Sequence, residues 1–202
     1  MQWEESALGF EFGPRWVVRR YDAHRFYQAI SGSDMKGVDF VAIYDDRRLV
    51  FIEVKNYTRR FGGRLPEVVP PLDRPREFAA HVSRKWHDSL QAVRIFQLVL
   101  LRNWRYRLLH RLLVRFLPAH HDWRFWTRAY RLTQTPGATH AMLWLELAPR
   151  YPVRERRYVP AERLARLAEA LEADLPEGIA SVCINGTHAA PDPAVLRVVP
   201  LG

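Results

Sequence analysis

The sequence predicts an α/β fold in which a mixed central β-sheet is flanked by helices, and three patterns support this. Two short apolar runs, residues 38–43 and 49–54, are rich in β-branched and aromatic side chains, which favours two antiparallel strands of a hairpin. From Glu77 onward, apolar residues recur at intervals of three and four, which is typical of an amphipathic helix. Strand-like and helix-like segments then alternate toward the C-terminus. A chain of 202 residues is expected to form one domain.

Local patterns predict the elements on either side of the hairpin. A short helix is expected within residues 1–13, and a strand at 16–22 leads toward the hairpin. The connection between this strand and the hairpin is expected to contain a short helical segment near residues 25–30. Residues 57–76 are rich in Pro, Gly and Arg, which predicts a long loop, and long loops are often functional.

The second half of the chain is expected to continue the core around a basic insertion. The helix from Glu77 should bury the face formed by Phe78, Val82, Lys85, Ser89, Val93, Phe96 and Leu100. Residues 102–135 are predicted as a basic helical insertion, broken at Pro118, into a core made of about 1–101 and 136–202. The remaining core elements are a strand at 140–147, a helix from Pro160 with Leu164, Leu167, Leu171 and Leu175 as its stripe, and strands at 179–184 and 194–199.

The hairpin carries charges where an apolar strand should have none. Asp39 lies at the start of the first strand, and Glu53 and Lys55 lie within the second. Because side chains alternate along a strand, Glu53 and Lys55 share a face with Leu49 and Phe51. A carboxylate and an ammonium on such a face are costly to bury unless they are paired or bind something. The charges therefore indicate a functional site.

The order Gly37, Asp39, then Glu53-Val54-Lys55 across an apolar hairpin resembles the PD-(D/E)XK nuclease superfamily. The resemblance implies a restriction-endonuclease-like core and metal-dependent hydrolysis of phosphodiester bonds, with DNA as the expected substrate. It also implies a role in antiviral defence, restriction or repair. Asp39, Glu53 and the main-chain carbonyl of Val54 would then hold Mg²⁺ or Mn²⁺. Lys55 would lie beside the attacking water, and Lys85 on the following helix would complete the catalytic set.

The chemistry of hydrolysis accounts for these residue types. A hard cation such as Mg²⁺ prefers oxygen ligands and keeps several waters, so one or two carboxylates suffice. The cation polarises the phosphate and orients or acidifies the water. An amine beside that water stabilises the developing negative charge. The alternative interpretation is a solvated edge strand on which Glu53 and Lys55 are ordinary surface residues.

Two details of the sequence bear on the resemblance. Val38 stands where the superfamily has its name-giving proline, and the acid that many members carry on a first helix is ambiguous between Glu4, Glu5 and Glu11. The chain also has only three lysines, at positions 36, 55 and 85, whereas its other strongly basic residues are arginines. Lysine is a compact point charge with a movable pKa, unlike arginine, which favours a functional role for Lys55.

The overall charge favours a polyanionic partner. The net charge is +9 and the isoelectric point is near 10.2. Such a charge favours nucleic acid as the binding partner, DNA more than RNA, and an acidic membrane surface as the second choice. The residues expected to grip phosphates are Lys36, Arg59, Arg60, Arg64, Arg105 and Arg111. Aromatic residues interleave with arginines between residues 102 and 132, as in single-strand binding surfaces, although the same pattern fits core aromatics with a wet basic face.

The cysteine content and the lengths of the apolar runs exclude several classes of protein. A single cysteine, Cys183, excludes an internal disulfide and a cysteine-rich zinc site. The N-terminal residues do not form a signal-peptide pattern, and the longest clean apolar run, 141–145, is too short to span a bilayer, so a cytoplasmic protein is expected. His120-His121-Asp122 is a weak candidate metal site.

Two other functions remain open at this point. A non-catalytic subunit could keep a nuclease-like scaffold for binding nucleic acid alone. A membrane-surface protein could bind through its basic helices. The sequence also leaves open whether the chain acts with a second copy of itself or with a partner protein.

Overall fold

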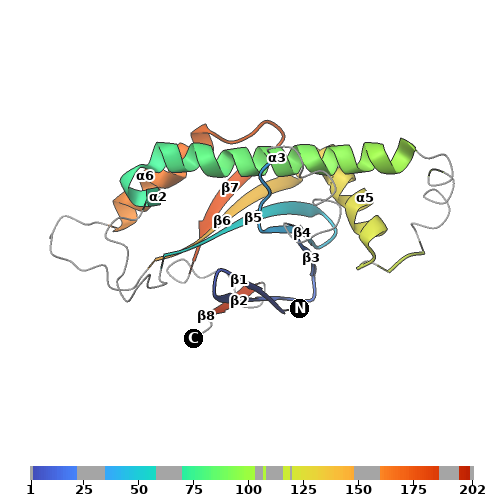
Figure 1. Cartoon of the computed structure of the whole chain (residues 1–202), viewed down its shortest axis with the longest axis horizontal. Coiled ribbons are helices and arrows are strands. Elements are labelled where there is room, and N and C mark those ends of the chain that lie inside the picture. Colours follow the sequence, from blue (N-terminus) through green and yellow to red (C-terminus); the bar gives the residue numbers. More distant parts are fainter. Residues whose placement is uncertain are drawn as a thin grey trace.

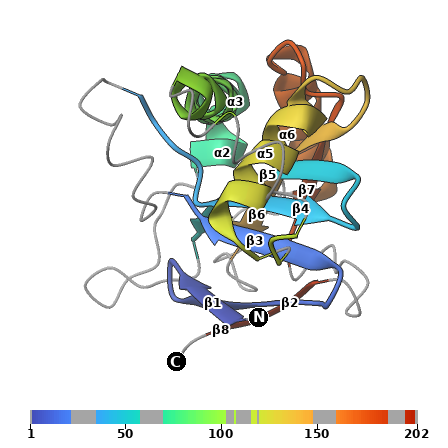
Figure 2. The ribbon, with the colours of Figure 1, turned by 90° about the vertical axis from the view of Figure 1, so that its right-hand side faces the viewer.

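The computed structural model describes residues 2–21, 35–57, 70–102, 107, 116–118, 120–147, 160–186 and 196–200. These residues form three layers (Figures 1 and 2): helices, a five-stranded sheet, and a smaller three-stranded sheet. The predicted α/β class with a mixed sheet flanked by helices is confirmed. The third layer, made of strands, was not expected.

The central sheet has the order β3-β4-β5-β6-β7. Its strands are β3 (Trp16–Arg20), β4 (Phe40–Tyr44), β5 (Arg48–Asn56), β6 (Thr139–Glu146) and β7 (Ser181–Asn185). The first three strands pair antiparallel, and β5, β6 and β7 pair parallel. The predicted hairpin is therefore confirmed as β4 and β5, and it places β5 at the centre of the sheet.

Helices cover one face of this sheet (Figure 2). They are α2 (Pro70–Asp73), α3 (Pro75–Arg102), α5 (Asp122–Thr133) and α6 (Pro160–Ala173). The main core lies beneath them and includes Leu49 and Phe51 of β5. The predicted buried face of α3 is confirmed for Phe78, Val82, Ser89, Val93 and Phe96, which are buried, whereas Lys85 on the same face is only partly buried. The element α2 lies within the stretch 57–76 that was predicted to be loop, most of which lies outside the described residues.

The helix α5 is part of this core, although residues 102–135 were predicted as an insertion. Its residues Phe125, Trp126, Ala129 and Leu132 are buried in the same cluster as the β5 side chains. Its arginines make local contacts: Arg128 pairs with Asp46 in the β4–β5 turn at 3.0 Å. None of the described helices combines the length and the apolar composition that crossing a bilayer requires.

The other face of the sheet is covered by strands β1 (Gln2–Glu5), β2 (Leu8–Phe12) and β8 (Leu196–Pro200), in the order β1-β2-β8. The prediction of a helix within residues 1–13 is wrong. Leu8, Phe10 and Phe12 alternate with less buried residues, a period of two that belongs to a strand, and they pack with Val50, Ile52 and Val54 in a second core. The alternation along β5 thus serves two cores, one on each face.

The remaining strands and helices agree with the predicted segments. The strands at 16–22, 140–147, 179–184 and 194–199 correspond to β3, β6, β7 and β8, and the helix from Pro160 is α6. Leu167 and Leu171 of α6 are fully buried. The expected helical piece near 25–30 and most of the expected helix at 102–117 lie outside the described residues.

Candidate active site

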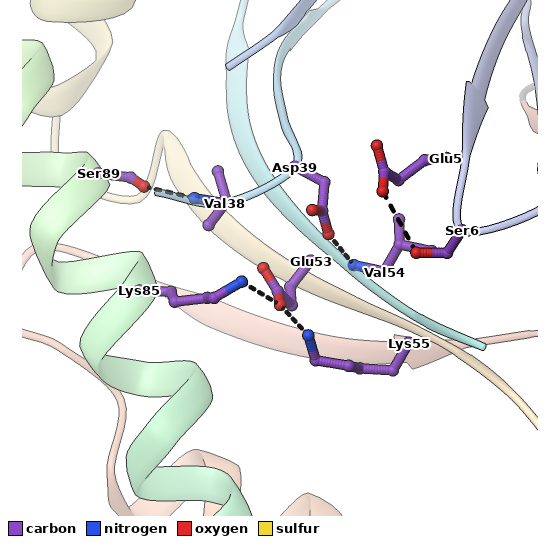
Figure 3. Close-up of polar contacts among 9 residues, drawn as sticks. All are labelled: Glu5, Ser6, Val38, Asp39, Glu53, Val54, Lys55, Lys85 and Ser89. Carbon is purple, nitrogen blue, oxygen red and sulfur yellow. Dashed lines mark hydrogen bonds and ion pairs between the residues drawn. The ribbon is translucent and has the colours of Figure 1, made fainter. Parts of the chain in front are cut away.

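Asp39, the residue that precedes β4 in the sequence, lies against the C-terminal half of β5 (Figure 3). The Asp39 Oδ2 atom accepts a hydrogen bond of 2.6 Å from the backbone N–H of Val54. Its backbone carbonyl accepts another, of 2.8 Å, from the N–H of Tyr21 at the end of β3. These two bonds hold the carboxylate of Asp39 against β5, next to Glu53.

Glu53 is the centre of the charged cluster. Its side chain is fully buried, although it is a carboxylate on a core-facing position of β5. The Glu53 Oε1 atom lies 2.6 Å from Lys55 Nζ and 2.7 Å from Lys85 Nζ, so two ammonium groups share one oxygen (Figure 3). The Oε2 atom is buried and has no hydrogen-bond partner among the described residues. One oxygen of Glu53 is thus left available to a ligand.

The buried charge of Glu53 affects two titratable neighbours, Asp39 and Tyr57. Desolvation and then the charge of Glu53 raise the pKa of Asp39 from 3.8 to about 7, although the Val54 hydrogen bond and the charge of Lys85 oppose the rise. Desolvation and then Glu53 raise the pKa of Tyr57 to about 12. At neutral pH a proton therefore spends much of its time on Asp39, because burial and then the charge of Glu53 disfavour its ionised form. A divalent cation between them would replace that proton.

The helix α3 positions the segment that leads into β4. The backbone N–H of Lys36 donates to Asp88 Oδ2, and that of Val38 donates to Ser89 Oγ, each at 3.0 Å. The second bond gives a physical reason for a residue other than proline at position 38. Proline has no backbone N–H, so it would leave the buried hydroxyl of Ser89 without this donor. The hydrogen bond to α3 thus holds the residue that precedes Asp39.

Replacing Ser89 by alanine is expected to lower the free energy of unfolding by about 1–3 kcal/mol, since it leaves the buried N–H of Val38 without its acceptor. Urea unfolding measures this change. Ser83→Ala is a matched control, because the Ser83 hydroxyl on the same helix makes an exposed hydrogen bond to the carbonyl of Asp174. Equal losses in the two variants would contradict the proposed role of Ser89.

The small sheet brings an additional acid close to the site. Glu5 ends β1, and its charge raises the pKa of Asp39, which identifies it among the three N-terminal candidates as the one that interacts with Asp39. Arg20 Nη2 lies 3.1 Å from Glu5 Oε2. The Asn56 side chain at the end of β5 donates to the carbonyl of Ser6 at 2.8 Å, which ties the β1–β2 turn to the site. Because Glu5 lies on a strand, the expectation of an acid on a first helix is not met.

The donor set of the site fits a hard divalent cation. Asp39 and Glu53 supply carboxylate oxygens, one of them buried and unsatisfied, as Mg²⁺ prefers. Within the described part of the chain, no group of three or more His, Cys, Asp or Glu side chains is close enough to hold a metal. The ligands that a cation would find here are the two acids, together with the main-chain carbonyl of Val54 that the resemblance implies. Mg²⁺ tolerates so few because it retains waters.

Only some of the other predicted residues lie at the site. Lys85 is brought to Glu53 by α3, while Lys36 is exposed at the edge of the site. The predicted phosphate contacts Arg59, Arg60, Arg64, Arg105 and Arg111 lie outside the described residues. The weak candidate at residues 120–122 has structural partners instead: His121 caps α5 by accepting from the N–H of Trp123, and Asp122 pairs with Arg19 at 2.8 Å.

Sequence reasoning missed Ser89 and Asp88 as supports, and it missed His81. The spacing of His81, four residues before Lys85 on a predicted helix, was the available signal. Comparisons of the chain with protein-family models, with curated proteins and with solved structures found no match. A function therefore has to be inferred from the geometry and charge of the chain's own residues.

Proposed function

We propose that this protein is a metal-dependent nuclease of the PD-(D/E)XK type that hydrolyses phosphodiester bonds, with DNA as its substrate. The observation that carries the proposal is the buried carboxylate of Glu53. It has two lysines on one oxygen, a second oxygen with no hydrogen-bond partner among the described residues, and the carboxyl group of Asp39 beside it. Structural ion pairs seldom leave a buried carboxylate oxygen unsatisfied, because doing so costs free energy. A bound cation would satisfy that oxygen.

Each residue has a distinct part in this proposal. Asp39 and Glu53 would hold the cation, with the carbonyl of Val54 as a third ligand, and Mg²⁺ or Mn²⁺ bound there would supply Lewis-acid activation of phosphate and water. Lys55 is the more exposed of the two lysines, at 27% against 18% for Lys85, and therefore lies nearer the solvent from which water and substrate arrive. Lys85 fixes the orientation of the Glu53 carboxylate. Lys55 stabilises negative charge that develops during hydrolysis.

The layers of the fold support the same proposal. The acids lie at two neighbouring antiparallel strands of a mixed sheet, Asp39 just before β4 and Glu53 on β5, and a long helix packs across that sheet and contributes Lys85. A restriction-endonuclease-like core would have this order of motif hairpin and helix, as the resemblance implies. The layer formed by β1, β2 and β8 would be an addition to such a core that closes its second face.

Asp39→Ala is expected to reduce cleavage by about 10³-fold or more, because the cation loses one of two carboxylates. The assay is incubation of labelled duplex DNA, single-stranded DNA and RNA with Mg²⁺, Mn²⁺ or EDTA. Asp45→Ala serves as a control, since Asp45 is an exposed aspartate in the turn between the same two strands. Metal-dependent cutting that persists in Asp39→Ala would refute the site.

The same assay distinguishes the proposed nuclease from a non-catalytic protein that only binds nucleic acid. Salt-sensitive binding without turnover by the wild-type protein, unchanged in Asp39→Ala, would indicate a nucleic-acid-binding scaffold with an ion-paired but inactive centre.

A further inference from the structure

All three lysines of the chain gather around the candidate active site, although they lie on three different segments. Lys36 precedes β4, Lys55 lies on β5 and Lys85 lies on α3. Lys55 and Lys85 both contact Glu53, and the positive charges of all three lysines act on the imidazole of His81. Three amines and one imidazole therefore share a patch at the edge of the acidic pair.

The helix α3 organises this patch. Residues 81, 85 and 88 follow one another at intervals of four and three, which places their side chains on one face of the helix. His81 is one turn before Lys85, about 6 Å along the helix axis. Lys36 is held to the same face through its backbone N–H, which donates to Asp88 Oδ2 at 3.0 Å. The exposed side chain of Lys36 thus emerges beside this face.

The patch has an inner and an outer part. Lys55 and Lys85 form the inner part, since both are largely buried and both contact Glu53. Lys36 and His81 form the outer part and are exposed to solvent. An ammonium and an imidazole N–H are both donors that suit phosphate oxygens. The separation of His81 from Lys85 along α3 is similar to that of neighbouring phosphates on a stretched strand.

We propose that Lys36 and His81 bind the phosphate next to the scissile one, so that the site takes a polynucleotide strand in preference to a molecule with a single phosphodiester. This inference rests on the proposed function, and it adds a second phosphate subsite to the metal centre. The inner lysines serve the scissile phosphate and the outer pair serves its neighbour. Substrates that lack the neighbouring phosphate would bind weakly.

Binding at this subsite is expected to change the charge of His81. Four charged groups act on the imidazole: Lys36, Lys55 and Lys85 lower its pKa, as desolvation does more strongly, and Glu53 raises it. The free protein therefore has a mainly neutral His81 at neutral pH. A phosphate beside the ring offsets the lysine charges, so the pKa of His81 rises and binding takes up a proton.

The matched control is His87, an exposed histidine on the same helix beside Asp88. It lies six residues after His81, which places it on a different face of α3. In the Asp39→Ala protein with EDTA, where a bound strand stays intact, His81→Gln is expected to weaken binding of a short fluorescein-labelled DNA strand about 5- to 10-fold. His87→Gln is expected to leave binding unchanged. RNA of the same sequence, as a second arm, distinguishes the two sources of phosphate.

Histidine side-chain NMR in the same Asp39→Ala background gives a second readout. Addition of the DNA strand is expected to raise the pKa of His81 and to leave the ring signals of His87 unchanged. Equal weakening by His81→Gln and His87→Gln, or an unchanged pKa of His81 with bound DNA, would overturn the subsite. A wild-type protein that shows the His81 effects but does not cleave DNA would refute the nuclease proposal and leave the phosphate subsite standing.

Discussion

Replacing Asp39 by asparagine is expected to stabilise the metal-free protein at about pH 8 by roughly 2–4 kcal/mol, while it removes cleavage. The folded protein holds the pKa of Asp39 at about 7, well above its ordinary value of 3.8, because burial and Glu53 disfavour the charged form. Asparagine is neutral at every pH and retains an oxygen that can accept from the N–H of Val54. The variant therefore avoids the cost of an ionised carboxylate in this position.

The sign of this effect fixes its pH dependence. A carboxyl group whose pKa is raised by folding favours the folded state below the unfolded pKa, and this contribution is lost as pH rises through the folded pKa. Wild-type stability should thus fall between about pH 4 and pH 7 relative to Asp39→Asn, and the gap should be largest above pH 7. Urea unfolding in EDTA across this range measures the gap, with Asp45→Asn in the exposed β4–β5 turn as control.

The effect of Mg²⁺ on the free energy of unfolding can be compared between the wild type and Asp39→Asn. A cation that binds the folded wild type raises its free energy of unfolding, and it should do so much less for Asp39→Asn. A variant that is no more stable than wild type at pH 8 in EDTA would mean that Asp39 is readily ionised and well solvated. The picture of an Asp39 carboxyl group whose pKa is raised by burial and by the charge of Glu53 would then be wrong.

Glu53→Gln is expected to destabilise the protein by about 3 kcal/mol, the second large effect. Removing one partner of a buried ion pair leaves the other charge uncompensated, and here Lys55 and Lys85 both contact the same oxygen. Guanidinium unfolding at neutral pH measures the loss. Glu162→Gln on α6 is the matched control, because Glu162 pairs with Arg166 at the surface, where such pairs contribute about 0–1 kcal/mol.

A double variant tests the cause of that loss. Adding Lys85→Gln to Glu53→Gln is expected to recover part of the stability, because it removes an ammonium that has lost its contact with the Glu53 carboxylate. If the double variant is less stable than Glu53→Gln by the full cost of Lys85→Gln alone, then the two residues are not energetically coupled. The contact at 2.7 Å would then contribute nothing beyond packing.

The hairpin and its charges were predictable because their signals are local. Alternation along β5 is enough to place Glu53 and Lys55 on the face that carries Leu49 and Phe51, and the structure agrees. The periodicity of α3 placed Lys85 on the buried face of the helix. It could not identify the partner of Lys85, because the sequence also offered Asp88, three residues further on the same helix.

The small sheet could not be predicted in the same way, because its pairing joins opposite ends of the chain. Leu8 pairs with Pro200 and Phe12 pairs with Leu196. A strand of five residues near the N-terminus gives a weak local signal, and its partner lies almost the whole chain away. For the same reason the sequence could not choose between Glu4, Glu5 and Glu11. That choice depends on the turn at Ser6 and Ala7, whose φ angles are 52° and 62°, and on its contact with Asn56.

This strand pairing also determines the order in which the two sheets can assemble during translation. The five strands of the central sheet have all been translated by Asn185, whereas β2 has to wait for β8 before its open edge is closed. The apolar side chains of Leu8, Phe10 and Phe12 emerge first, and their last neighbour, Leu196, emerges almost at the end. The nascent chain should therefore reach a stage with the helical side already assembled and the hairpin that carries Glu5 still loosely held.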